Sequence, residues 1–162
     1  MEALFTPWRA AYLAGGGVDA GGCLFCELPK HDDAEALVVH RGRLAYVVLN
    51  RYPYTNGHLM VAPFAHRAGL SEMTSDERHE VVDLAGRFES ILRETYRPHG
   101  FNAGLNLGRS AGAGVEHHAH LHLVPRWDGD TNFLSVLGGT RTIPEDLPTT
   151  RARLAAALAR AS

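Results

Sequence analysis

Three histidines alternate with small or apolar residues in the segment His118-Ala119-His120-Leu121-His122. In a β-strand, positions i, i+2 and i+4 share one face, and successive members stand roughly 6.6–7 Å apart. We therefore expect the imidazoles to line one face and the residues between them to face a core. An ordinary exposed strand face would mix Thr, Lys, Glu and Ser. A face that repeats histidine indicates chemistry, because imidazole acts as a nucleophile, an acid or base, or a metal ligand.

The composition is typical of one globular domain. The chain has 162 residues, 45% of them hydrophobic, a net charge of −2 and an isoelectric point near 6.5. This length suffices for one core, and the charge gives no general attraction to nucleic acid or to anionic membranes. The sequence has neither an apolar run that could span a membrane nor a signal-peptide pattern. We expect a cytoplasmic protein without nucleic-acid or membrane partners, with a glycine-rich arm over residues 1–22 and a single domain over 23–162.

Strand and turn signals predict an antiparallel sheet of about five strands with one long helix. The helix is expected to begin at Ser75 or Asp76, since apolar residues from Val81 to Leu92 recur with helical spacing, and to end before Pro98. A short helix is expected over residues 151–160. Strands with one segregated helix favour the α+β class. The strands are expected over residues 37–40, 44–49, 57–62, 101–107 and 118–126.

Cys23 and Cys26 are the two cysteines of the chain and form a Cys-x-x-Cys motif. In a reducing compartment such a motif is a redox pair, half of a zinc site, or two buried thiols without a ligand. No βαβ pattern surrounds it, so a thioredoxin-like role is disfavoured and zinc is favoured. A tetrahedral site needs two further ligands, and the available donors are His66 and one of the alternating histidines.

A glycine-rich loop over residues 106–114 joins the last two predicted strands. Glycine lets backbone N–H groups approach an anion closely, and successive N–H groups form an anion-binding concavity. The loop is therefore a candidate for phosphate binding, with a merely flexible connection as the alternative. It is not a Walker loop, because no Gly-Lys-Ser or Gly-Lys-Thr occurs. Asn50 and His58, at the end of one strand and the start of the next, are either site residues or turn residues.

The segment His118 to Val124 resembles the signature of the histidine triad family, His-φ-His-φ-His-φ-φ with φ apolar. The similarity spans about Cys23 to Trp127. Within the family, Pro7-Trp8-Arg9 and residues 127–133 are most similar to the bacterial diadenosine tetraphosphate phosphorylase-like and fragile-histidine-like branch. Other residues that fall in family order are Asn50, His58, Pro63, His66, Asn106 and Pro125-Arg126.

The resemblance implies a homodimer in which each protomer supplies an antiparallel sheet of about five strands. The active site would lie on the sheet face near the helix. It further implies an enzyme with a nucleotide substrate, which cleaves dinucleoside polyphosphates such as diadenosine tetraphosphate through a covalent nucleotidyl-histidine. Phosphate or water would accept the nucleotidyl group.

The resemblance also implies roles for individual residues. His120 would be the nucleophile that attacks the α-phosphorus. His122 and His58 would orient His120 and stabilise phosphate charge. A structural zinc ion would be held by Cys23, Cys26, His66 and His118. The substrate-binding residues would be Asn50 for ribose, Asn106, Gly112 and Gly114 for phosphate, and Leu24, Phe25 and Val48 for the base.

The chain departs from the family pattern just before the triad. Many members carry Gln followed by Ser or Thr there, whereas this chain has Ala113-Gly114 and one extra residue near His117. Because the family side chains contact the leaving group, that role is unassigned here, and Ser110 and Arg109 are the candidate replacements. His117 is expected to point away from the active face.

Other functions fit the same residues. A nucleoside phosphoramidate hydrolase, of the adenylyl-lysine type, would share the covalent intermediate. A metal-dependent hydrolase would use His118, His120 and His122 together as ligands of a catalytic zinc ion. The motif contains no carboxylate to act as its base, and the Cys-x-x-Cys motif would be left without a function. A nucleotide-binding module without turnover is a further alternative.

Overall fold

The protein is described by a computed structural model for residues 22–130 and 143–161. Except for residue 22, the predicted arm over residues 1–22 lies outside the described residues, as do Pro7-Trp8-Arg9 and residues 131–133 of the family resemblance. In chain order the elements are α2 (Leu24–Glu27), η1 (Leu28–Lys30), β1 (Val38–Arg41), β2 (Ala45–Leu49), β3 (Leu59–Pro63), α3 (Ser75–Tyr96), β4 (Gly100–Leu105), η2 (Arg109–Ala111), β5 (Leu121–Arg126) and α5 (Leu147–Arg160).

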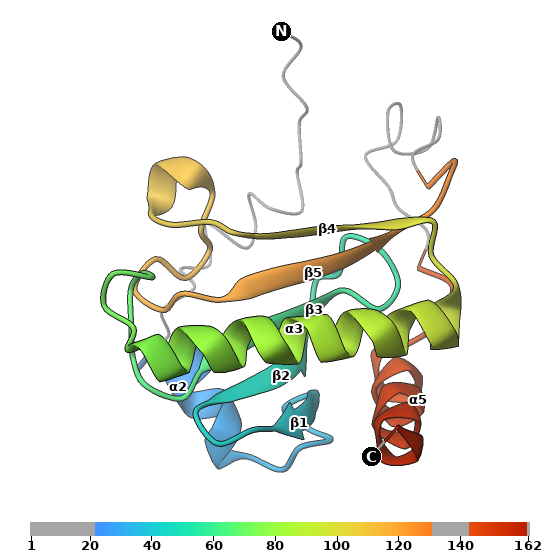
Figure 1. Ribbon diagram of the computed structural model, residues 1–162, viewed down its shortest axis with the longest axis horizontal. Coiled ribbons are helices and arrows are strands. Elements are labelled where there is room, and N and C mark those ends of the chain that lie inside the picture. Colours follow the sequence, from blue (N-terminus) through green and yellow to red (C-terminus); the bar gives the residue numbers. More distant parts are fainter. Residues whose placement is uncertain (1–21, 131–142, 162) are drawn as a thin grey trace, which may run out of the picture.

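The five strands form one sheet in the order β1-β2-β3-β5-β4, with every neighbouring pair antiparallel (Figure 1). β5 lies between β3 and β4, and His122 is opposite Met60 on one side and Gly104 on the other. The predicted α+β class and the five-stranded antiparallel sheet are confirmed.

The long predicted helix is α3. A capping box begins it: the Thr74 hydroxyl accepts from the Glu77 N–H at 3.2 Å, and the Glu77 carboxylate accepts from the Thr74 N–H at 2.7 Å. Thr74 is therefore the N-cap, one residue earlier than Ser75. The helix ends at Tyr96, and its C-cap Arg97 adopts the left-handed conformation with φ 49° directly before Pro98.

α3 covers the sheet face opposite the triad histidines His118, His120 and His122. Residues paired across the sheet share a face, and the series His40, Val47, Val61, Leu121 and Leu105 crosses all five strands. Phe101 is four residues before Leu105 in β4, so His40 and Phe101 lie on one face. The His40 ring lies 6.1 Å from that of Phe88 in α3, and the Arg93 guanidinium lies 4.9 Å from the Phe101 ring centre. His122 has the other parity, since Leu121 and Leu123 point toward α3. The triad histidines were expected on the sheet face near the long helix, and that expectation is wrong, because they lie on the other face.

The last predicted strand is shorter than expected. β5 begins at Leu121, so His118, Ala119 and His120 precede the ladder. The Ala119 N–H donates at 2.6 Å to the Arg67 carbonyl, in the loop between β3 and α3. The backbone therefore pairs with a loop, which a strand pattern in the sequence cannot reveal.

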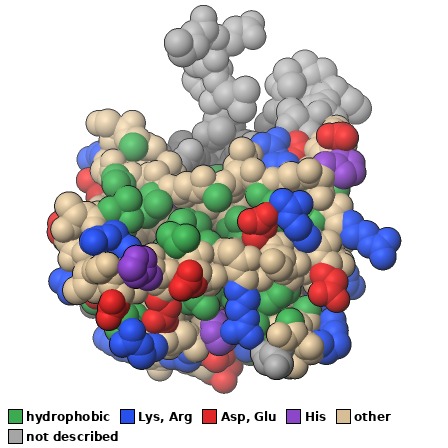
Figure 2. Space-filling view, viewed as in Figure 1, with side chains coloured by type: hydrophobic (Ala, Val, Ile, Leu, Met, Phe, Trp, Pro, Cys, Tyr) green, Lys and Arg blue, Asp and Glu red, His purple; other side chains and the backbone are tan. Residues whose placement is uncertain are grey.

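The terminal helix is longer than predicted. α5 begins at Leu147, because the Asp146 carboxylate caps the Thr149 N–H at 2.8 Å and proline is tolerated in the first turn. Arg151 donates to the Val38 carbonyl at 2.8 Å and fixes α5 against β1. On the α3 side of the molecule, basic and acidic side chains are interspersed (Figure 2). Among residues 22–130 and 143–161, no helix is long and apolar enough to cross a membrane.

Candidate functional site

The three alternating histidines lie on one side of the sheet, although only His122 belongs to β5. Phe25 of α2 contacts two of them, with ring centres 5.4 Å from His118 and 4.4 Å from His120. The rings of His120 and His122 are 4.8 Å apart. The histidine face is therefore covered by the short α2, while Leu123 points into the core with 2% of its surface exposed.

His118 faces a cluster of sulfur and nitrogen atoms. Its Nε2 lies 2.9 Å from the Pro63 carbonyl, which can only accept, so Nε2 carries the proton. Its Nδ1 then presents a lone pair toward Cys23 Sγ at 3.3 Å and Cys26 Sγ at 3.5 Å. His66 Nδ1 lies 3.4 Å from Cys26 Sγ.

This cluster fits a tetrahedral metal ion. One ligand atom from each of Cys23, Cys26, His66 and His118 lies within 4.8 Å of all the others. Zinc bonds of about 2.0–2.3 Å in a tetrahedron separate ligand atoms by roughly 3.5 Å. The closest sulfur–nitrogen separations, 3.3–3.5 Å, match that value, and two thiolates with two imidazoles are a typical structural zinc set.

His120 is held as a neutral imidazole with a defined tautomer. Its Nδ1–H donates to the His118 carbonyl at 2.8 Å, so its Nε2 carries the lone pair. Burial lowers the pKa of His120, while the hydrogen bond to the His118 carbonyl opposes that shift. A neutral, oriented imidazole with its Nε2 lone pair available is a competent nucleophile.

A relay of hydrogen bonds runs through His58 to His122. The Tyr54 N–H donates to His58 Nδ1 at 3.1 Å, so His58 Nε2 carries the proton and donates to His122 Nδ1 at 3.0 Å. His122 Nε2 must then carry a proton, because its Nδ1 accepts from His58. Burial, with smaller effects of His122 and His120, lowers the pKa of His58 to about 3. Asn50 Nδ2 lies 3.4 Å from His58 Nδ1.

A cleft of about 380 Å³ begins at His122 and runs along β4 and β5. Within it, Arg126 is paired with Asp130 at 2.5 Å and donates to Asn102 at 2.7 Å. No sequence pattern predicts a role for Tyr54, Asn102 or Asp130, because their place in the cleft depends on how β4, β5 and two loops come together. The lining residues are Tyr54, Thr55, Asn102, Ala103, Gly104, Leu105, Asn106, His122, Val124, Arg126 and Asp130.

The glycine-rich loop is less open to an anion than predicted. The Gly112 N–H donates to the Arg109 carbonyl at 2.9 Å, and the Ala113 N–H to the Gly108 carbonyl at 3.3 Å. These donors are engaged within the η2 turn, contrary to the expectation for Gly112. Gly114 is half-buried, and its role in phosphate binding stays a prediction. Asn106 does line the cleft.

The other predicted binding residues occupy varied environments. Leu24 is 41% exposed, whereas Phe25 and Val48 are each about 1% exposed, so a base would contact these two only after a local rearrangement. Arg109 forms an exposed ion pair with Glu116 at 3.8 Å. His117 is exposed, as expected. The roles of Leu24, Phe25, Val48, Asn50 and Ser110 stay predictions.

The geometry does not support one catalytic metal ion bound by all three triad histidines. The Nδ1 atoms of His118, His120 and His122 face the cysteines, a backbone carbonyl and His58, respectively. Within the described part of the chain, the metal-binding cluster includes only His118 of the three. The arrangement therefore disfavours a metal-dependent hydrolase that uses the three histidines as ligands of one ion.

The pKa of His58 predicts a pH dependence of stability. Below about pH 6.5 the unfolded chain protonates this imidazole while the folded chain does not, until pH falls to about 3. The free energy of unfolding should therefore fall with decreasing pH in this window, by up to about 1.4 kcal/mol per pH unit from this group. When the free energy of unfolding is measured with urea at pH values from 7 to 4, its decrease with falling pH should be steeper for the wild type than for His58→Gln. The same change at exposed His117 is the control, and parallel curves for all three proteins would contradict the prediction.

Comparisons of the sequence with known proteins point to one family. A model of the HIT domain matches residues 31–129. A protein named AP-4-A phosphorylase from Mycobacterium tuberculosis is 44% identical over 167 residues, covering 99% of this chain and 86% of the relative.

Solved structures share the fold. A Zn-bound histidine triad family protein from Mycobacterium smegmatis has a TM-score of 0.71 and 28% identity, covering 86% of this chain and 95% of that chain. A histidine triad nucleotide-binding protein from Sulfolobus tokodaii, at 22% identity and a TM-score of 0.69, covers 85% of this chain and 93% of its own, and shows the same fold. The predicted family and the prediction of an enzyme are confirmed. This chain belongs to the histidine triad (HIT) family.

Proposed function

We propose that this protein cleaves dinucleoside polyphosphates, such as diadenosine tetraphosphate, by transferring a nucleotidyl group to Nε2 of His120. The observation that carries the proposal is the hydrogen bond from His120 Nδ1–H to the His118 carbonyl, which leaves Nε2 as the nucleophilic nitrogen. The substrate class is supported by the 44% identity to the protein named AP-4-A phosphorylase.

The first step forms a bond between His120 Nε2 and the α-phosphorus and breaks the bond from that phosphorus to the bridging oxygen. With diadenosine tetraphosphate the leaving group is ATP, and adenylate stays on the ring. The His122 Nε2–H, fixed by the relay from His58, donates to a phosphate oxygen where negative charge develops. Splitting the displacement into two steps lowers each barrier.

The second step transfers adenylate from His120 to an oxygen of phosphate or water. Phosphate gives ADP and restores the free imidazole, whereas water gives AMP. We propose phosphate as the acceptor, because the 44% identical relative is named a phosphorylase.

The function is tested by product analysis with a nucleophile variant. Wild-type protein with diadenosine tetraphosphate and phosphate should form ATP and ADP, and His120→Ala should lose at least about 10³-fold of the rate, as when an essential nucleophile is removed. His117→Ala, at an exposed neighbouring histidine, should retain the wild-type rate.

The outcomes separate the alternatives. AMP and ATP formed regardless of phosphate would indicate hydrolysis. Faster turnover of an adenylyl-lysine analogue would identify a phosphoramidate hydrolase. Wild-type turnover by His120→Ala would reject the covalent mechanism, and nucleotide binding without turnover by the wild type would indicate a binding module.

We propose zinc as the resident metal of Cys23, Cys26, His66 and His118, with a structural role. The ion would join α2, the β3–α3 loop and the triad segment at one point and so fix the backbone that aims His120. Thiol ligands must stay reduced to bind, which supports a reducing compartment such as the cytoplasm.

Removing a thiol should affect stability more than chemistry. We expect Cys23→Ser to lose bound zinc and to lower the Tm by roughly 10 °C, about 3–5 kcal/mol for a chain of this length. Turnover per folded molecule should fall less than threefold. Zinc content, calorimetry and kinetics on the same preparation measure the three quantities. An unchanged Tm with lost turnover would instead place the metal in the reaction.

We propose a homodimer formed along β4. This strand is at the edge of the sheet, and its central residues Asn102, Ala103 and Gly104 are exposed. An uncovered edge of small side chains is a template for pairing with a second strand. Light scattering after gel filtration should give about twice the 17.6 kDa chain mass. A monomer mass at micromolar concentration would contradict the proposal.

A further inference from the structure

The triad segment His118–His120, which precedes β5, forms hydrogen bonds with the last residue of β3 and with the loop between β3 and α3. The Pro63 carbonyl accepts from the His118 ring at 2.9 Å, and the Arg67 carbonyl accepts from the Ala119 N–H at 2.6 Å. Ala119 lies between the metal-cluster residue His118 and the nucleophile His120. The position of the Arg67 backbone therefore affects the direction of both rings.

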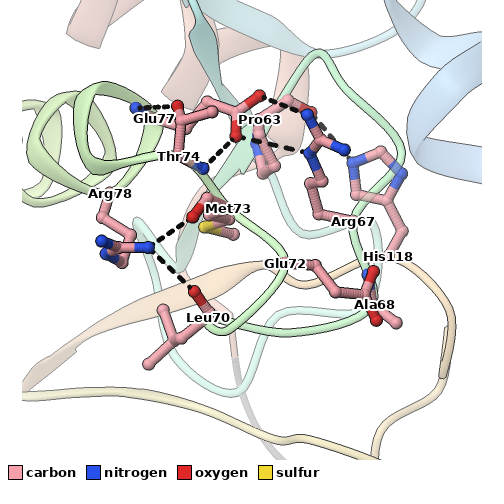
Figure 3. A network of polar contacts seen from close by, with 10 residues as sticks. All are labelled: Pro63, Arg67, Ala68, Leu70, Glu72, Met73, Thr74, Glu77, Arg78 and His118. Carbon is pink, nitrogen blue, oxygen red and sulfur yellow. Dashed lines mark hydrogen bonds and ion pairs between the residues drawn. The ribbon is translucent and has the colours of Figure 1, made fainter.

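An ion pair to α3 fixes Arg67. Its Nε and Nη2 atoms lie 3.4 Å from the two carboxylate oxygens of Glu77, whose side chain is only 7% exposed (Figure 3). Glu77 also accepts from the Thr74 N–H in the capping box. One buried carboxylate thus joins the first turn of α3 to the residue that holds Ala119.

The charge of Glu77 exceeds what capping requires. A capping box forms with Gln as well as with Glu, so the helix start alone does not need a carboxylate. The Thr74 N–H and the Arg67 guanidinium together hold the pKa of Glu77 below its ordinary value, and the group is ionised at neutral pH. What the charge adds is the pairing with Arg67.

The other end of the same loop has a separate anchor. Arg78 donates to the carbonyls of Leu70 and Met73. Neither of these two contacts involves the segment His118–His120 (Figure 3). The chain therefore contains two arginines that stabilise one loop, of which only Arg67 contacts the segment that carries His120.

We propose that Arg67 and Glu77 are positioning residues that hold the Ala119 backbone and thereby aim His120 at phosphorus. This inference rests on the proposed function of His120. Its physical basis is the sensitivity of nucleophilic attack to geometry, since a displacement of about 1 Å can cost about 10²-fold in rate. The Arg67 side chain acts through its own backbone carbonyl and does not touch the substrate.

The test compares matched arginine variants loaded with zinc. The rate of adenylate transfer to His120 is measured in a single turnover with enzyme in excess over diadenosine tetraphosphate. We expect Arg67→Met and Glu77→Gln each to slow it about tenfold, and the double variant to be no slower than either. Arg78→Met should stay within twofold of wild type at a comparable loss of Tm, and Arg67→Lys should recover part of the rate.

Zinc content and amide exchange give readouts besides activity. Zinc per chain should be unchanged in Arg67→Met, and the Ala119 N–H should exchange faster with deuterium in this variant but not in Arg78→Met. If Arg67→Met does not fold, Glu77→Gln carries the test, because it keeps a capping acceptor.

Three results would overturn the proposal: Arg67→Met within twofold of wild type, an equal slowing in Arg78→Met, or a rate loss that follows zinc loss. If wild-type protein forms no adenylate on His120, the proposed function fails instead. The coupling of Arg67 to the triad segment is then decided by Ala119 exchange alone.

Discussion

The geometry of the site depends on the contacts that three polar groups of His118 make: its two ring nitrogens and its carbonyl. Its Nε2–H donates to the Pro63 carbonyl, its Nδ1 faces the two cysteine sulfurs, and its own carbonyl accepts the Nδ1–H of His120. The residue is fully buried, so it has no room to turn without displacing its neighbours. A single residue thus connects the candidate metal-binding cluster to His120, the proposed nucleophile, and its contacts define the tautomers of both imidazoles.

Burial lowers the pKa of histidines both in the candidate metal cluster and around His120. It is the largest cause of the lowered pKa of His58, His118 and His120. A metal ligand, a nucleophile and a neutral hydrogen-bond relay all require imidazole without a second proton. Phe25 of α2 packs on the rings of His118 and His120 and contributes to the burial of these two histidines.

Local patterns in the sequence predicted the elements of this fold, and geometry between distant segments decided the rest. The strand signals and the apolar period of α3 are visible within a few residues, and the five strands and the long helix are confirmed, although β5 begins three residues later than the histidine alternation predicts. Cys23 and Cys26 lie in one cluster with His66 and His118. The start of β5 and the face covered by α3 depend on contacts such as Ala119 with Arg67. The engaged N–H of Gly112 is likewise a property of the turn conformation, which composition does not specify.

The charge of the metal cluster explains why its effect on the chemistry would be geometric. A Zn²⁺ ion together with two thiolates and two neutral imidazoles forms a site with no net charge. Such a site would add little electric field at His120. The nucleophile would then gain orientation from the metal, through the carbonyl of His118, rather than a shifted pKa. The Arg67–Glu77 pair is also close to neutral as a unit and reaches the triad segment through a backbone carbonyl. Both supports act on the position of His120 and leave its basicity to burial.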